Sequence, residues 1–206
     1  MLRLKPILLP IAAALFLCAC SEAPKTETAK APEKPPEPLT GRQAFQRIYP
    51  QARGWAVDAQ PMSIRSINLS QVKSGNGTAG AWEVIFVSDS KGQARSYTYS
   101  AVEAQGNLHE GVFAGSPDSY GGPRGGTTPF SSVAIKFDSD QAFATASEKS
   151  QDYIKKHPDM PITYVLEQTK RFPDPTWRVI WGESASSSDY SVYVDATLGT
   201  YIEKAH

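Results

Sequence analysis

Two stretches of alternating hydrophobic and polar residues lie almost a hundred positions apart and have nearly the same order. Residues 81–87 read AWEVIFV, and residues 176–182 read TWRVIWG. Successive side chains of a strand point to opposite faces, so each stretch presents three hydrophobic residues on one face. These residues are Trp82, Val84 and Phe86 in the first stretch, and Trp177, Val179 and Trp181 in the second. A shift of 95 residues maps the first set onto the second.

The same shift maps a second pair of predicted strands onto each other, residues 97–101 and residues 192–196. In each case a polar, turn-rich stretch joins the two strands, SDSKGQ in the first and GESASSSD in the second, which is typical of a hairpin. Another candidate strand precedes each hairpin, at residues 62–72 and at residues 162–169.

A helix is predicted before each group of strands. Thr40 with Gln43, and Asp138 with Gln141, have the spacing of a capping box, and Gln-Ala-Phe follows in both places. The first helix has a short hydrophobic face that stops before Pro50. The hydrophobic face of the second helix contains Phe143, Ala146, Ser150, Tyr153 and Ile154, and the helix is expected to end near His157, before Pro158.

These patterns predict an α+β fold of two tandem helix-plus-antiparallel-sheet units, each with one helix packed on three to four strands. The first unit is expected at 40–110 and the second at 133–206, joined by a Gly/Pro-rich connector at 111–132. Residues 133–137, VAIKF, are a candidate for an extra strand. The alternative is a chance likeness between two helix-and-hairpin segments.

Residues 1–19 have the pattern of a secretory signal. Arg3 and Lys5 precede a hydrophobic run at 7–17 that is too short to span a bilayer. Leu-Cys-Ala-Cys then ends at Cys20 and resembles the lipobox of bacterial lipoproteins. The resemblance implies cleavage before Cys20 and lipidation of its thiol, palmitate included. An ordinary secretory signal, cut nearby, is the alternative.

Residues 20–39 are expected to form a lipidated, disordered stalk, because this segment is rich in proline and charge and poor in large hydrophobic residues. It would reach roughly 60 Å at most when extended. Cleavage leaves 187 residues, with 19 basic and 21 acidic side chains, which does not favour nucleic-acid binding. The lipoprotein resemblance also implies a location: Ser21 follows Cys20, and in that class a residue other than Asp at this position is typical of sorting to the outer membrane, with the protein facing the periplasm.

The second unit resembles a PepSY domain over residues 139–204. The resemblance rests on KKHPDM at the end of the predicted helix, TWRVIWG, and a strand that runs into Val194-Asp195-Ala196-Thr197-Leu198-Gly199. In that turn Asp195 can accept backbone N–H bonds and Gly199 can adopt a positive φ. The first unit has only a degenerate version at 102–106. The resemblance implies an extracytoplasmic binding or regulatory module, with peptidase inhibition as a proposed role.

Candidate sites for chemistry are few. His109, His157 and His206 are scattered, and no motif for a metal, a cofactor or a nucleophile is present. Arg124, among the glycines of SYGGPRGGTT, could help to form an anion-binding nest or belong to a mobile connector. Trp177 and Trp181 could stack on a ligand, although their shared face with Val179 favours the core.

We therefore expect a noncatalytic binding or regulatory lipoprotein of the bacterial envelope. It would be anchored in the membrane through the lipid on Cys20 and would act on another envelope protein. A structural or assembly component of the envelope is the alternative, and an enzyme with a site hidden from sequence reasoning is the third possibility.

Overall fold

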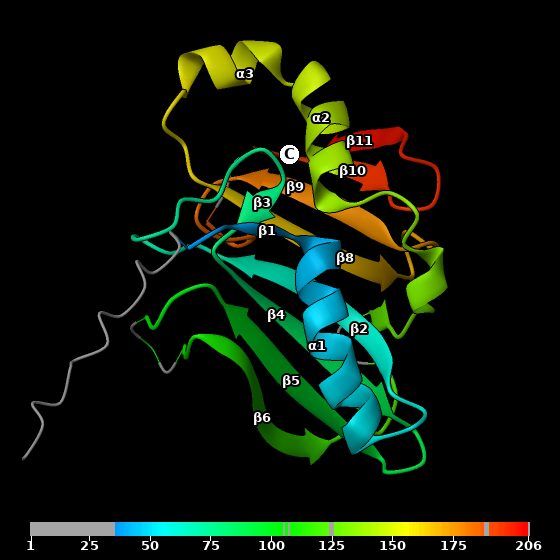
Figure 1. Cartoon of the computed structure of the whole chain (residues 1–206). Coiled ribbons are helices and arrows are strands. Elements are labelled where there is room, and N and C mark those ends of the chain that lie inside the picture. Colours follow the sequence, from blue (N-terminus) through cyan, green and yellow to red (C-terminus); the bar gives the residue numbers. More distant parts are fainter. Residues whose placement is uncertain (1–35, 105, 107, 124–125, 188–189, 206) are drawn as a thin grey trace, which may run out of the picture. The chain divides into compact units, whose positions relative to one another are not determined.

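An antiparallel sheet of nine strands dominates the described part of the chain (Figure 1). The structure is a computed structural model and describes residues 36–104, 106, 108–123, 126–187 and 190–205. The strands follow the order β11-β10-β9-β8-β2-β4-β5-β6, and β7 pairs with β8 beside this path. Their bounds are β2 Gln60–Ile67, β4 Ala81–Ser88, β5 Gln93–Ser100, β6 Gly111–Ser119, β7 Thr127–Thr128, β8 Ile162–Thr169, β9 Thr176–Trp181, β10 Tyr190–Asp195 and β11 Tyr201–Ala205.

Two helices pack on the same face of this sheet. Helix α1 (Gly41–Trp55) covers β4 and β5, and α2 (Ser139–Glu148) covers β9 and β10 (Figure 1). Phe45 of α1 stacks on Phe86 at 5.7 Å, and Phe143 of α2 meets Tyr164 at 6.4 Å. The short helices α3 (Gln151–Lys156) and η1 (Ser132–Ala134) are the other helical elements of the residues that the structure describes. None of the described helices is both long and apolar enough to cross a bilayer.

The expectation of two helix-plus-sheet units is wrong, because the sheet runs continuously through both halves. Strand β2 of the first half pairs antiparallel with β8 of the second, with Arg65 opposite Val165. Residues 35–206 form one compact unit. The pairing has a physical reason, since each half alone would end in a strand edge with unpaired backbone donors and acceptors.

The local signals at the helix starts are confirmed. Thr40 and Asp138 are the N-caps of α1 and α2, and both capping boxes are complete. The turn after β10 is also as expected, because Oδ1 of Asp195 accepts backbone N–H bonds from Thr197 at 2.6 Å and from Leu198 at 3.1 Å. Gly199 has a φ of +72°.

Several expected boundaries are corrected. Helix α1 does not stop at Pro50 but continues through it to Trp55, since Ala52, two residues further on, is fully buried. The region expected as a connector contains β6, which pairs with β5. Strand β6, and not β5, is therefore the last strand on that side of the sheet. The segment VAIKF forms no strand, and its first two residues belong to η1 instead.

The expected stalk also ends earlier than position 39. Leu39 and Thr40 form β1 (Leu39–Thr40), which pairs with β3 (Thr78–Ala79) in a two-stranded sheet. The carbonyl oxygen of Leu39 accepts a hydrogen bond from Nε1 of Trp82 at 2.9 Å. Residues 1–19 and most of the stalk lie outside the described residues.

Candidate functional site

The residues singled out from the sequence do not form a site. Cys20 and Arg124 lie outside the described residues. Trp177 and Trp181 are buried, with 0% and 2% of their surface exposed, and Nε1 of Trp177 donates to the carbonyl oxygen of Phe137 at 3.0 Å. Stacking of a ligand on either ring is therefore ruled out, and their expected place in the core is confirmed.

Trp181 nevertheless supports the floor of a surface groove. Its indole meets the ring of Tyr190 edge-on at 5.4 Å, and Tyr190 stacks on Tyr153 at 4.0 Å and 15°. Tyr153 comes from α3 and Tyr190 from the start of β10. The two rings thus bring the helical layer and the sheet together at the end of the molecule that carries β11.

The groove exists because the expected second helix is broken. Helix α2 ends at Glu148, and α3 begins at Gln151. Oγ of Ser150 donates to the carbonyl oxygen of Ala146 at 2.7 Å, a local bond that competes with the helical ladder. The same oxygen accepts a hydrogen bond of 3.1 Å from the hydroxyl of Tyr190. Ser150 therefore ties the break in the helix to the sheet.

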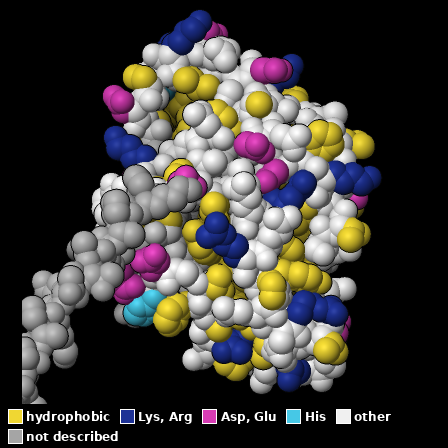
Figure 2. Space-filling view, in the orientation of Figure 1, with side chains coloured by type: hydrophobic (Ala, Val, Ile, Leu, Met, Phe, Trp, Pro, Cys, Tyr) yellow, Lys and Arg dark blue, Asp and Glu magenta, His cyan; other side chains and the backbone are white. Residues whose placement is uncertain are grey.

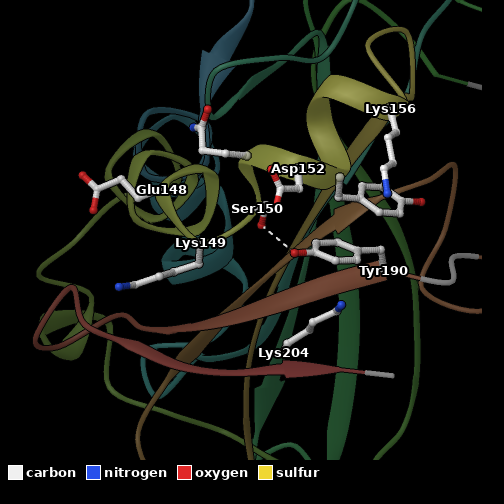
Figure 3. A pocket seen from close by; sticks show the side chains of 9 residues that line it. Glu148, Lys149, Ser150, Asp152, Lys156, Tyr190 and Lys204 are labelled. Carbon is white, nitrogen blue, oxygen red and sulfur yellow. Dashed lines mark hydrogen bonds between the residues drawn. The ribbon is translucent and has the colours of Figure 1, made fainter.

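The resulting groove has a volume of 430 Å³ and lies between the α2–α3 break and the β10–β11 hairpin (Figure 3). Lys156 and Lys204 extend toward Tyr190 from opposite sides, whereas Glu148 and Lys149 extend away from it (Figure 3). Nζ of Lys204 lies 4.4 Å from the centre of the Tyr190 ring, a cation–π contact. The centre of the groove is thus aromatic and mostly basic, with Asp152 as its acidic member.

Strand β11 borders this groove and is the last strand of the sheet. It pairs with β10 on one side, and among the described residues no strand pairs with its other side. Next to this edge the structure exposes Leu198 at 64%, Tyr201 at 39% and Ile202 at 37%. An exposed edge with hydrophobic side chains is a template for an additional strand.

The arrangement is suited to binding an extended chain. The edge of β11 offers backbone hydrogen bonds, its exposed side chains offer hydrophobic contact, and Lys156 and Lys204 offer cations for carboxylates. Within the described residues no group of three His, Cys, Asp or Glu side chains could hold a metal ion. Figure 2 shows that on the face with the helices hydrophobic, basic and acidic side chains are interspersed, without one dominant charge.

Sequence reasoning missed Ser150, Tyr190 and Lys204. A signal for the first was present, because a serine inside a predicted helical face can bond to the carbonyl four residues earlier and bend the helix. Lys204 carries no local signal, since its role depends on the pairing of Val192 with Lys204 across β10 and β11.

Comparisons with known proteins add little to this picture. No protein-family model and no curated protein matches the chain, so the PepSY resemblance stays a prediction. One similar solved structure is that of a Clostridium difficile 630 protein described as a "putative lipoprotein". It is 9% identical, with a TM-score of 0.45, and the match covers 79% of this chain and 91% of that chain. A likeness this distant supports no inference about fold or function.

Proposed function

We propose that the protein is a lipid-anchored lipoprotein of the bacterial envelope that acts without catalysis, by binding another envelope protein. The anchor is the lipid on Cys20, and the location is the outer membrane, facing the periplasm. The partner presents an extended segment with acidic side chains. The PepSY resemblance makes a peptidase the first class of partner to test.

The anchor rests on the sequence Leu17-Cys18-Ala19-Cys20. A single acyl chain holds a protein only marginally, whereas two or more chains hold it firmly. The proline-rich segment that follows would keep the folded unit, which begins with β1, away from the membrane surface.

The observation that carries the binding proposal is the position of the β11 edge beside the Tyr190–Lys204 groove. A strand added to β11 would pair through its backbone, and every second side chain would point to the helix side of the sheet. On that side lie Tyr201, within 5.8 Å of Nζ of Lys149, and Lys204. Acidic side chains of the added strand would meet these ammonium groups.

The anchor is tested by two single substitutions. Cys20→Ala should release the protein from membranes or leave its signal uncut, and Cys18→Ala should change neither outcome. Membrane fractionation and the mass of the mature N-terminus measure both. If Cys18→Ala abolishes anchoring and Cys20→Ala does not, the proposed processing is wrong.

The groove is tested with synthetic strand-forming hexapeptides that alternate Val with Glu or Val with Lys. Fluorescence anisotropy should show binding of the Val-Glu peptide and at least about tenfold weaker binding of the Val-Lys peptide. Lys204→Glu should abolish this preference, whereas Lys91→Glu, on the distant β4–β5 turn, should keep it. Equal binding of both peptides to the unmodified protein would refute the groove as an acidic-segment site.

The noncatalytic part of the proposal has its own test. The purified chain is assayed with peptidase, esterase and glycosidase substrates, with and without divalent metals. Turnover that copurifies with the protein and is lost in a folded point variant would overturn it.

A further inference from the structure

The sheet face opposite α1 and α2 carries a row of directly paired residues. Arg65 of β2 lies opposite Val165 of β8, and Val165 lies opposite Arg178 of β9. Arg178 in turn lies opposite Tyr193 of β10. Because adjacent strands are about 4.8 Å apart, the two arginines are held on strands about 10 Å apart, one on each side of β8.

Glu167 lies two residues after Val165 on β8, so its side chain is on the same face as this row. It is diagonal to both arginines, because its direct cross-strand partners are Ser63 and Thr176. Among the described residues no donor makes a hydrogen bond to its carboxylate, and no ion pair includes it. Burial raises the pKa of this carboxyl, and the charges of Arg65 and Arg178 oppose that rise.

These residues line a small cavity of 180 Å³ that also includes Phe172 and Tyr193. The two rings lie 4.7 Å apart and form one wall. Arg171 reaches over both rings and forms an ion pair with Glu203. Arg171 is therefore already neutralised, and the charges left in the cavity are those of Arg65, Arg178 and Glu167.

The charged side chains of the cavity have hydrogen-bonding groups that the described residues leave unused. Arg178 donates through Nε to Oγ of Ser191 at 2.8 Å, and no other bond of its guanidinium is recorded among the described residues. Arg65 is exposed and makes no hydrogen bond within the same part of the chain. Two guanidinium groups therefore offer donors, and Glu167 needs a donor.

A ligand of one negative charge would balance the two arginines and Glu167. A carboxylate carries one negative charge, and its two coplanar oxygens can accept two parallel N–H bonds from a guanidinium. A doubly charged phosphate would meet repulsion from Glu167. An N–H group close to the ligand carboxylate would supply the hydrogen bond that Glu167 lacks.

We infer that this cavity binds the C-terminal carboxylate of a peptide. The carboxylate pairs with Arg65 and Arg178, the last backbone N–H donates to Glu167, and the last side chain packs on Phe172 and Tyr193. The site lies on the opposite face of the sheet from the groove beside β11. It does not depend on the function proposed for that groove.

Four probes separate the parts of this recognition in calorimetric titrations of the full chain in detergent. The probes are acetyl-Ala-Ala-Leu with a free carboxylate, its C-terminal amide, the same acid methylated on the nitrogen of its last peptide bond, and free leucine. The free acid should bind at least about tenfold more tightly than the amide and than the N-methylated acid. Free leucine should bind more weakly than the acid, because its ammonium group, which takes the place of the last backbone N–H, loses more hydration on entering the cavity.

Variants tie the binding to the cavity. Arg65→Met should weaken the acid about tenfold and should leave the fold intact, because Arg65 is exposed and unpaired within the described chain. The Glu167→Leu variant should bind the acid and its N-methylated form with equal affinity. Because both affinities are measured on the same variant, a general change in the charge of the cavity does not alter their ratio. Arg53→Met, on α1 at the other face, should change nothing.

Each result decides the proposal. No binding of the acid, or equal binding of acid and amide, would overturn it. Equal binding of the acid and its N-methylated form to the unmodified protein would overturn the role of Glu167. Tighter binding of free leucine than of the peptide acid would show an amino-acid site instead of a peptide site.

Discussion

The hydroxyl of Thr40, the N-cap of α1, donates a hydrogen bond of 2.5 Å to Oδ2 of Asp138, the N-cap of α2. The other oxygen of Asp138 accepts the backbone N–H of Arg42 at 2.8 Å, in the first turn of α1. Oγ of Ser139 accepts the N–H of Gly41, also at 2.8 Å. Helix α1 is thus capped partly by residues of α2, nearly a hundred positions away.

This shared cap predicts a coupled loss of stability. Asp138→Ala should destabilise the protein by about 2–4 kcal/mol, because it leaves several buried N–H and O–H donors without an acceptor. Combined with Thr40→Val in a double-mutant cycle, it should show a coupling of about 0.5–3 kcal/mol in urea unfolding. Asp140→Ala, which loses only the bond from the N–H of Gln141, is the control. Additive losses at Thr40 and Asp138 would contradict a shared cap.

The two tryptophans related by 95 residues also meet. Trp82 and Trp177 are fully buried, and their rings pack edge to face at 6.4 Å and 74°. Trp177→Ala should therefore cost about 3–5 kcal/mol in the free energy of unfolding. Denaturant titration measures this cost. Tyr201→Ala, at an exposed position, should cost far less, and a loss below about 1 kcal/mol for Trp177→Ala would mean that the ring is not in the core.

Local sequence signals predicted the elements but not their assembly. The capping boxes, the two hairpins and β8 depend on residues within a few positions of each other, so their patterns are readable from the sequence. The pairing of β2 with β8 depends on two strands a hundred residues apart. The pairing gives hydrogen-bond partners to the backbone N–H and C=O groups at two strand edges. These groups are present whatever the side chain, so the side-chain pattern does not show where they pair.

The candidate groove was hidden for a related reason. Its parts come from the break at Ser150, the start of β10 at Tyr190 and the edge strand at Lys204. None of these residues belongs to a motif, and only the tertiary fold brings them together. The sequence did point to Trp181, as a core residue first and a ligand-stacking candidate second, but it did not show that this core ring supports Tyr190.

The turn after β10 yields a third prediction. A Cβ atom at Gly199 would lie 2.6 Å from ring atoms of Phe137, and the φ of +72° is costly for other residues. Gly199→Ala should therefore destabilise the protein by about 2–4 kcal/mol, the sum of backbone strain and overpacking. Gly92→Ala is matched for backbone, with a φ of +59°, but its nearest contact is 3.8 Å away. Equal losses in thermal unfolding for the two variants would show that the ring of Phe137 moves aside.

Asp58 provides a prediction about acid stability. Its carboxylate accepts hydrogen bonds from Oγ of Ser88 at 2.7 Å and from the backbone N–H of Ser90 at 2.9 Å. These bonds lower the pKa of Asp58 from 3.8 to about 2. The stability that these bonds add is fully present above the ordinary pKa of 3.8, and it is lost as the pH falls through the lowered pKa of about 2. The stability advantage of the unmodified protein over Asp58→Asn should therefore shrink between pH 4 and pH 2 in urea titrations, and a constant difference would contradict the assignment.

Glu167 should show the opposite dependence on pH. Burial raises the pKa of its carboxyl, so the charged form is less favourable in the folded protein than in the unfolded chain. The contribution of Glu167 to stability is therefore fully present below the ordinary pKa of 4.5 and is lost as the pH rises through the raised value. Relative to the unmodified protein, Glu167→Gln should gain stability between pH 4 and pH 7, as measured by urea unfolding at both values. A gain that is constant or falls with pH would contradict the raised pKa. A carboxylate that lowers stability at neutral pH is consistent with a residue kept for binding, because functional sites are commonly retained at the expense of stability.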